Sequence, residues 1–279
     1  MLKLLLPWLV AVNLWAEAPR PRPGFEGLEL RLTGLTAAGS GAPRDRSAGL
    51  ELVGDFALTQ RQDWRYGWGF RLAEVRHDWA AAPLEFSFVR SCSLNLSGHA
   101  ATSAGRTRYA VLQLNAAAGT GAPLGGALTA QALYGADWKV AEAWTLGYLF
   151  LAETRAVRDP LVLVVPTFRW RFAPDWSVGT GRKSLVLDRR LDDAWRASLT
   201  LAFLQEEARL ADVGGLAQSY EAERVALLAG LRRSAPQRTD EFTVGWAFRA
   251  RARWALGGGE TASDLAPGVV FSYASRWRF

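Results

Sequence analysis

The sequence of 279 residues has little cysteine, histidine and lysine. Its single cysteine, Cys92, excludes an internal disulfide. With two histidines and no Cys/His cluster it offers no metal site, and its glycine-rich stretches do not lead from a strand into a helix, so no phosphate-binding loop or cofactor is expected. After the first 18 residues no apolar run reaches the ~20 residues of a membrane helix, which excludes a helical membrane protein.

The basic residues are nearly all arginine. Only three of the 33 basic residues are lysines, and the formal net charge is +6. Nucleic-acid binding requires basic residues gathered in a patch or run. Here the arginines are scattered singly along alternating segments. A nucleic-acid partner is therefore not expected.

The N-terminus, "MLKLLLPWLVAVNLWAEA", has the outline of a secretory signal peptide. One cation precedes a short apolar run, and small residues follow at Ala16 and Ala18. We predict a signal peptide over 1–16, with cleavage after Ala18 as the alternative, and a proline-rich leader over 17–26. The competing interpretation is a short buried helix. The prediction implies export from the cytoplasm.

Alternation of apolar with small or charged residues recurs along the rest of the chain. Such a period of two is typical of β-strands, whose successive side chains point to opposite faces. Each segment has roughly ten residues, the length at which a tilted strand crosses a bilayer. The thirteen segments are 27–36, 48–58, 64–75, 84–95, 106–117, 126–138, 144–154, 160–172, 176–187, 195–207, 220–233, 241–254 and 268–279.

Large aromatic residues occupy one parity of most segments. In 241–254, Phe242, Trp246 and Phe248 alternate with small residues, and arginines follow on the other parity. So many broad aromatic faces would overfill the core of a soluble sandwich, but they suit a lipid-facing surface with girdles of Trp and Tyr. The prediction is an all-β fold, an antiparallel transmembrane β-barrel over 27–279. A soluble periplasmic sandwich or lipocalin-like binder is the alternative.

The number of strands should be even, since single-chain bacterial barrels place both termini in the periplasm. Segment 27–36 is the weakest, so we predict twelve strands, with ten or fourteen as alternatives. The Ala/Leu-rich stretch 209–231 could be helical, but its alternation favours strand. With Phe279 in the periplasm, 255–266 and 208–219 become outer connections, and 234–239 and 188–194 become inner ones.

The last strand, "GVVFSYASRWRF", places Phe271, Tyr273, Trp277 and Phe279 on one face. It resembles the C-terminal targeting signal of bacterial outer-membrane barrels, with a polar residue at Ser272, a small one at Ala274 and aromatics at the end. The resemblance implies recognition by the barrel assembly machinery and residence in the bacterial outer membrane.

A second resemblance covers roughly 160–255. The stretches "FAPDWS" (172–177) and "EARLAD" (207–212), each at a strand end, resemble a family of uncharacterised outer-membrane β-barrel proteins, a domain of unknown function. The resemblance implies fold and location and assigns no activity.

Arginines on the small-residue parity are the strongest candidates for a functional lining. Arginine facing lipid would cost roughly 2–4 kcal/mol at mid-depth, so an inward orientation is cheaper. They could line a narrow anion-favouring pore. Alternatively they pair with inward acids such as Glu51, Asp55, Glu153 and Glu241 and form a plugged barrel. The predicted lumen-lining residues are Arg169, Arg171, Arg224, Arg232, Arg249, Arg251, Arg253, Arg276 and Arg278.

Catalysis has few candidate residues. Some outer-membrane barrels are lipases with a Ser-His pair, and here His99 has Ser97 and Ser103 nearby in a predicted outer loop, but Ala101 breaks the His-x-Ser pattern. His77 is placed at a strand end near an inner turn. Outer-membrane proteases use acidic residues and a histidine, so Asp192/Asp193 and Glu206/Glu207 were weighed and interpreted as solvated turn or strand ends. No catalytic residue is predicted.

The sequence therefore predicts an exported, monomeric barrel surrounded by outer-membrane lipid. Its role would be a narrow porin-like channel for small solutes or anions, or a plugged structural barrel. A lipid-acting or proteolytic barrel enzyme is the alternative.

Overall fold

The computed structural model describes residues 24–37, 43–61, 63–83, 86–102, 105–124, 128–155, 157–181, 183–213, 216–256 and 259–279. The predicted signal peptide and residues 17–23 of the predicted leader lie outside these ranges. Among the described residues no helix is long and apolar enough to cross a membrane. The strands are β1 (Gly24–Ala37), β2 (Arg44–Arg61), β3 (Trp64–Ala80), β4 (Phe88–Thr102), β5 (Arg106–Gly119), β6 (Leu128–Lys139), β7 (Trp144–Glu153), β8 (Leu161–Ala173), β9 (Trp176–Gly181), β10 (Ser184–Arg190), β11 (Trp195–Val213), β12 (Leu216–Ser234), β13 (Arg238–Leu256), β14 (Gly259–Asp264) and β15 (Gly268–Arg278).

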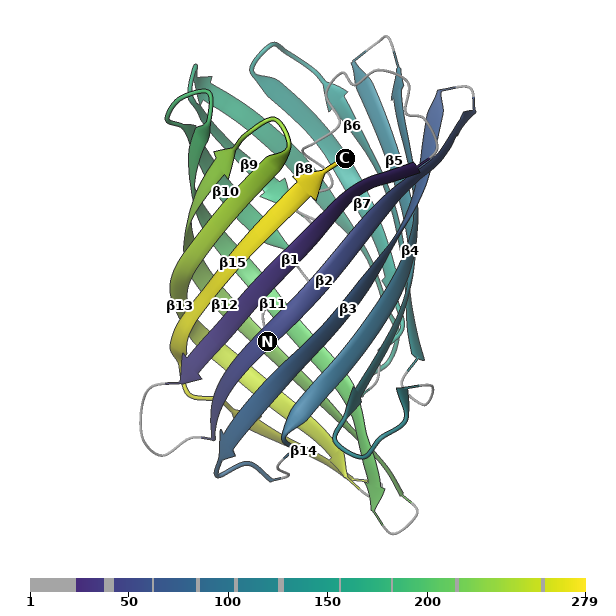
Figure 1. Cartoon of the computed structure of the whole chain (residues 1–279), viewed down its shortest axis with the longest axis vertical. Coiled ribbons are helices and arrows are strands. Elements are labelled where there is room, and N and C mark those ends of the chain that lie inside the picture. The colour runs from purple at the N-terminus through teal and green to yellow at the C-terminus, as the bar shows by residue number, and fades with distance from the viewer. Residues whose placement is uncertain are drawn as a thin grey trace.

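The strands form a closed antiparallel barrel (Figure 1). Each strand from β1 to β13 pairs with the next, β13 pairs with β15, and β15 pairs with β1 from Gly27↔Arg278 to Ala37↔Gly268. Fourteen strands, β1 to β13 and β15, therefore close the ring, and β14 pairs only with the part of β13 beyond β15. The barrel class is confirmed. The preferred count of twelve is wrong, and the alternative of fourteen is correct.

Two misread segments account for the count. The alternation of segment 176–187 predicts one strand, but the segment forms the hairpin β9–β10, in which Gly181 pairs with Ser184. Segment 27–36, discounted as the weakest, is the core of β1, which starts at Gly24 and pairs on both edges. The described residues of the 209–231 stretch, 209–213 and 216–231, are strand, as predicted, and belong to β11 and β12.

The outer wall of the barrel carries an apolar belt. Partners across neighbouring strands share a face, and pairs such as Leu94↔Leu114 and Leu72↔Cys92 run around the outside. Exposed apolar side chains on this face would be costly in water and suit lipid. The belt includes Leu30, Leu32, Leu50, Leu72, Leu94, Leu96, Leu112, Leu114, Tyr134, Leu146, Phe150, Val162, Val164, Leu199, Leu201, Leu227, Val244, Trp246 and Phe271.

The end of the barrel at which β15 finishes and β1 begins is here called the C-terminal end (Figure 1). Aromatic side chains on the outer wall form a girdle there. Several of its tryptophans lie next to the tight turns there and have an arginine guanidinium over the ring, at 5.0 Å for Arg106–Trp138 and Arg189–Trp176. Such amphipathic rings suit a membrane interface. Phe279, which follows the last strand, is part of this girdle, with its side chain 78% exposed and its ring stacked on Phe25.

The wall is uneven in height. Strands β11, β12 and β13 have 19 residues each, whereas β7, β9 and β10 have 10, 6 and 7. At the opposite end, here called the far end, the short strands β6 to β10 have stopped, and β11 meets β5 in a parallel contact at Arg209↔Ala118. The lower part of the barrel is therefore narrower, closed by β5 against β11.

Gly119 allows that closure. A Cβ on Gly119 would lie 2.6 Å from Leu210 Cδ2, and Leu210 is itself buried. The close approach of β5 and β11 therefore depends on the missing side chain.

A β-bulge divides β13. The register with β12 shifts between Val225↔Arg249 and Ala226↔Ala247, which leaves Phe248 unpaired. A one-residue insertion moves every following side chain to the other face. Beyond the bulge, Ala250, Ala252 and Trp254 therefore face the lumen, where they are buried.

Candidate pore

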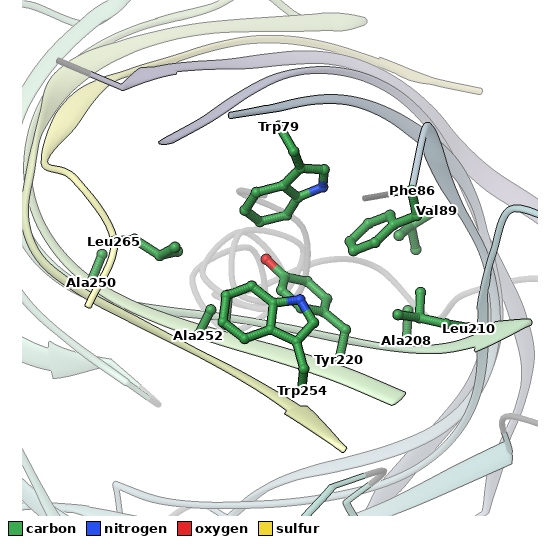
Figure 2. Packing of buried hydrophobic residues seen from close by; sticks show 11 residues of the cluster. Trp79, Phe86, Val89, Ala208, Leu210, Tyr220, Ala250, Ala252, Trp254 and Leu265 are labelled. Atoms are coloured by element: carbon green, nitrogen blue, oxygen red, sulfur yellow. The ribbon is translucent and has the colours of Figure 1, made fainter. Parts of the chain in front are cut away.

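Four aromatic side chains meet across the lumen near the far end (Figure 2). Trp79 comes from β3, Tyr220 from β12, Trp254 from β13, and Phe86 from the β3–β4 connection. The ring centroids of Trp79 and Trp254 are 6.2 Å apart, those of Trp79 and Tyr220 5.6 Å, and those of Phe86 and Tyr220 5.0 Å. Edge-on contacts of this kind are favourable for aromatic rings. We call these four residues the aromatic cluster; they constrict the lumen.

A charged group lies directly next to the aromatic cluster on the lumen side. The His77 ring stacks on Trp79 with a centroid distance of 5.6 Å. Its Nδ1 lies 3.0 Å from Asp45 Oδ1, and its Nε2 lies 3.7 Å from Glu206 Oε1. Arg224 Nη2 donates to Asp45 Oδ2 at 2.9 Å. Strands β2, β3, β11 and β12 are thus joined across the lumen by charges.

Further ion pairs line the barrel toward the C-terminal end. Arg71 donates two hydrogen bonds to Glu51, at 2.8 and 3.1 Å, and both side chains are buried. Paired charges satisfy one another where a single buried charge would be costly. The other pairs are Arg31–Glu29, Arg276–Asp55 at 2.8 Å and Arg232–Glu241 at 2.7 Å.

Six of the nine predicted lining arginines lie on β8, β12 and β15 in the C-terminal part of the barrel or within the charged group. Arg224, Arg232 and Arg276 point into the lumen and are paired with acids. Arg169 shares the inner face with Thr167 and Asp137, and Arg278 shares the face of Arg276 at the mouth. Arg171 is exposed near the end of β8.

The prediction for Arg249, Arg251 and Arg253 differs from the structure. These residues follow the bulge at Phe248, so they lie on the outer face, opposite to Ala250, Ala252 and Trp254. Arg253 pairs there with Glu223 and Glu260, at 3.3 Å each.

The two histidines lie at the ends opposite to those predicted. His99 was placed in an outer loop, but it lies in β4 near the C-terminal end, opposite Tyr109 and Arg65. His77 was placed near an inner turn, but it lies near the far end of β3. Ser97 Oγ donates to the carbonyl of Gly67 at 3.4 Å. Ser103 lies outside the described residues.

The acidic pairs have ordinary roles at their positions. Asp192 Oδ1 accepts hydrogen bonds from the amides of Ala194 and Trp195, at 2.7 and 2.8 Å, and so caps the β10–β11 turn. Glu206 is not solvated as interpreted from the sequence, because its side chain is buried against His77 on the inner face of β11, whereas Glu207 points to the outer face. In the part of the chain that the structure describes, no group of three or more His, Cys, Asp or Glu residues could hold a metal ion.

Sequence reasoning missed the aromatic cluster and its charged neighbours. Val75, His77 and Trp79 do share one parity, which could have indicated an inward face. Trp254, however, is assigned to the outer face by the uninterrupted alternation of 241–254, and only the bulge brings it inside.

No protein-family model and no curated protein matches this sequence. The resemblance of 160–255 to uncharacterised outer-membrane proteins stays a prediction.

Solved structures do match. An outer-membrane channel from Pseudomonas putida F1 aligns with a TM-score of 0.57 at 10% identity, covering 96% of this chain and 98% of that one. A FadL homologue from Pseudomonas aeruginosa aligns with a TM-score of 0.50 at 11% identity, covering 92% and 90%. At these identities the similarity establishes the fold, that of an outer-membrane β-barrel.

Proposed function

We propose that this chain is an integral outer-membrane β-barrel that forms a narrow channel for small solutes, with the aromatic cluster as its constriction. The observation that carries the proposal is the contrast inside the lumen. Charged and hydrogen-bonding side chains line the barrel above the cluster, and four rings then meet across it. A polar lumen is typical of barrel channels, and an apolar constriction can close a channel by excluding water.

The proposed orientation places the C-terminal end in the periplasm and the aromatic cluster on the outer side. Fourteen strands, with β1 starting and β15 ending at one end, agree with this arrangement. Outer-membrane lipid would surround the belt, and the barrel assembly machinery would recognise Phe271, Tyr273, Trp277 and Phe279. Export would follow cleavage of the signal peptide, and the barrel would act as a monomer.

Charge selectivity should be weak. The lumen arginines Arg71, Arg224, Arg232 and Arg276 are each paired with an acid, so they add little net positive charge. Arg278, near the C-terminal mouth, would supply a modest preference for anions.

A plugged structural barrel is the second candidate, because the same ion pairs tie the lumen walls together. Conductance separates the two. We propose no catalytic role for Ser97, whose hydroxyl donates to the carbonyl of Gly67.

The test uses residues 17–279 refolded in detergent and inserted into a planar bilayer. Trp79→Ala combined with Trp254→Ala should raise the single-channel conductance several-fold, because the constriction is removed. The matched control is Trp144→Ala with Trp246→Ala, two lipid-facing residues exposed by 37% and 42%. The control should leave conductance unchanged.

A folded barrel that stays silent in both variants would contradict the channel and favour the plugged structural barrel. Folding is checked by circular dichroism and by the heat-dependent shift in electrophoretic mobility.

A further inference from the structure

A polar cleft lies between the inner face of β5–β7 and the outer face of β11. Nine of its ten lining residues are polar or charged, and the cavity in it is about 30 Å³, room for about two water molecules. The lining comprises Gln113, Asn115, Thr129, Ala130, Gln131, Glu153, Thr154, Lys183, Gln205 and Glu207. In this cleft, side chains on the inner face of β5–β7 thus contact side chains on the outer face of β11.

The cleft exists because the short strands β6 to β10 end before the level at which β5 contacts β11. β10 pairs with β11 only as far as Ser184↔Ala202, and β5 joins β11 only at Arg209. Between these points β11 separates two spaces. On its inner face Ala208 packs with the aromatic cluster and Glu206 faces His77, whereas its outer face looks into the cleft.

A chain of polar contacts crosses the cleft. Gln131 donates to Glu153 at 2.8 Å, and Lys183 Nζ lies 3.5 Å from Glu153 and donates to Gln205 at 2.6 Å. Gln205 in turn donates to Glu221 on the outer face of β12, at 3.1 Å. These bonds show that β6 and β7 face the outside of β11 and β12.

Arg158, in the β7–β8 connection, is the last residue in this series of polar contacts, on the side of the far end. Its guanidinium donates to Glu221, with Nε 2.8 Å from Oε2, and also to Glu223. The Glu221 side chain is fully buried, whereas that of Arg158 is 26% exposed. The pair of carboxylates holds the loop against β12, and we call this contact the Arg158 latch.

The cleft is joined to the main lumen. A second cavity, lined by Arg71, Ser93 and Glu206, lies on the lumen side of β11. It shares Asn115, Thr129 and Glu207 with the cleft. The two spaces therefore adjoin at the edge of β11.

We propose that the cleft is a second branch of the lumen, which passes β11 on its outer side, bypasses the aromatic cluster and is gated by the Arg158 latch. The proposal rests on the proposed channel function. The branch differs from the main path in chemistry, since the main path ends in four aromatic rings and the branch in amides, carboxylates and a lysine.

The lining selects the solute class. Glutamine and asparagine side chains offer both donors and acceptors, and the carboxylate of Glu153 is paired with both Arg155 and Lys183. Such a surface suits small neutral solutes rich in hydroxyl groups. Glycerol is a probe of this class.

The experiment compares Arg158→Gln, which keeps the length but removes the charge, with Arg76→Gln. Arg76 also pairs with a glutamate, Glu74, but lies on the outer wall of β3 with its side chain 82% exposed. Arg158→Gln should raise glycerol permeation in liposome swelling at least twofold, and Glu221→Gln with Glu223→Gln should do the same. Arg76→Gln should have no effect.

A cysteine readout identifies the route. In a Cys92→Ser background, Gln131→Cys should react with a hydrophilic methanethiosulfonate reagent, and the modification should abolish the glycerol flux gained by Arg158→Gln. Flux through Trp79→Ala with Trp254→Ala should persist after this modification, because it leaves by the aromatic path.

The outcomes separate the two proposals. If the tryptophan variant conducts but Arg158→Gln gains no flux, or gains flux that modification at position 131 does not block, the second branch is wrong and the channel stands. If no variant conducts, the channel itself is wrong.

Discussion

The two sides of the barrel wall differ in height and in inner chemistry. Strands β11 to β13, with 19 residues each, run far beyond the 9–11 residues that a membrane strand needs, whereas β9 and β10 have only 6 and 7. The inner face of the long strands carries the buried pair Arg224–Asp45 and an apolar group that includes Leu204 and Leu228. The inner face of the short strands carries an apolar group built around Leu133, Leu149 and Leu151 and, toward the far end, the polar lining of a cleft.

This difference shows how one sheet forms two enclosures. The full ring of fourteen strands makes a wide C-terminal half, and the long strands alone close a narrower far half through the β5–β11 contact. The narrow half is small enough for four aromatic rings to span it. The edge at which the short strands stop produces the polar cleft.

Removing one partner of a buried ion pair should have the largest effect on stability. Arg71→Ala leaves the Glu51 carboxylate buried without its two hydrogen bonds and should cost about 3–5 kcal/mol of unfolding free energy. The measurement is a urea titration of the folded barrel in detergent micelles.

The matched control replaces both partners, with Arg71→Met and Glu51→Leu. This variant should recover most of the lost stability, because no charge is left unpaired. A double variant as unstable as Arg71→Ala would show that packing, and not charge, governs this site.

The contact between β5 and β11 should depend on the absence of a side chain at Gly119. A Cβ added at Gly119 would lie 2.6 Å from Leu210 Cδ2, and the methyl groups of valine would add to this clash. Gly119→Val should therefore lower the free energy of unfolding by about 1–3 kcal/mol through overpacking. Urea titration measures the loss, and Gly24→Val, at a position with open space around it, is the control. Equal stability of the two variants would mean that β5 and β11 can separate without cost.

The smallest effect on stability and selectivity is expected for a substitution beyond the bulge in β13. Arg251→Ser should change unfolding free energy by less than about 0.5 kcal/mol and leave ion selectivity unchanged, because Arg251 is exposed on the outer face. Arg276→Ser, which removes a charge from the lumen and unpairs Asp55, should shift the reversal potential in a salt gradient. A shift of similar size for Arg251→Ser would place that side chain inside the lumen.

Local alternation was enough to predict most of the strands and the lipid-facing side of each. A period of two records the two faces of a strand directly, so the outward position of Phe271, Tyr273 and Phe279 followed from the sequence. The inward position of Arg224, Arg232 and Arg276 followed in the same way.

The predicted number of strands was wrong in part because alternation alone does not reveal a turn. Segment 176–187 alternates through Gly179 and Gly181 as a single strand would, yet the chain reverses direction beside Gly181. Glycine fits a strand pattern and a turn equally well, so the pattern alone could not separate the two.

The sequence by itself thus determined an antiparallel barrel, its lipid-facing surface and the charges available for its lumen, because these depend on neighbours along one strand. Only the tertiary structure decided the ring of fourteen, the outward turn of Arg249 and Arg251, and the meeting of Trp79, Tyr220 and Trp254. These features depend on the register between strands, and the bulge at Phe248 exchanges the two faces of β13. The alternation pattern within one strand does not determine that register.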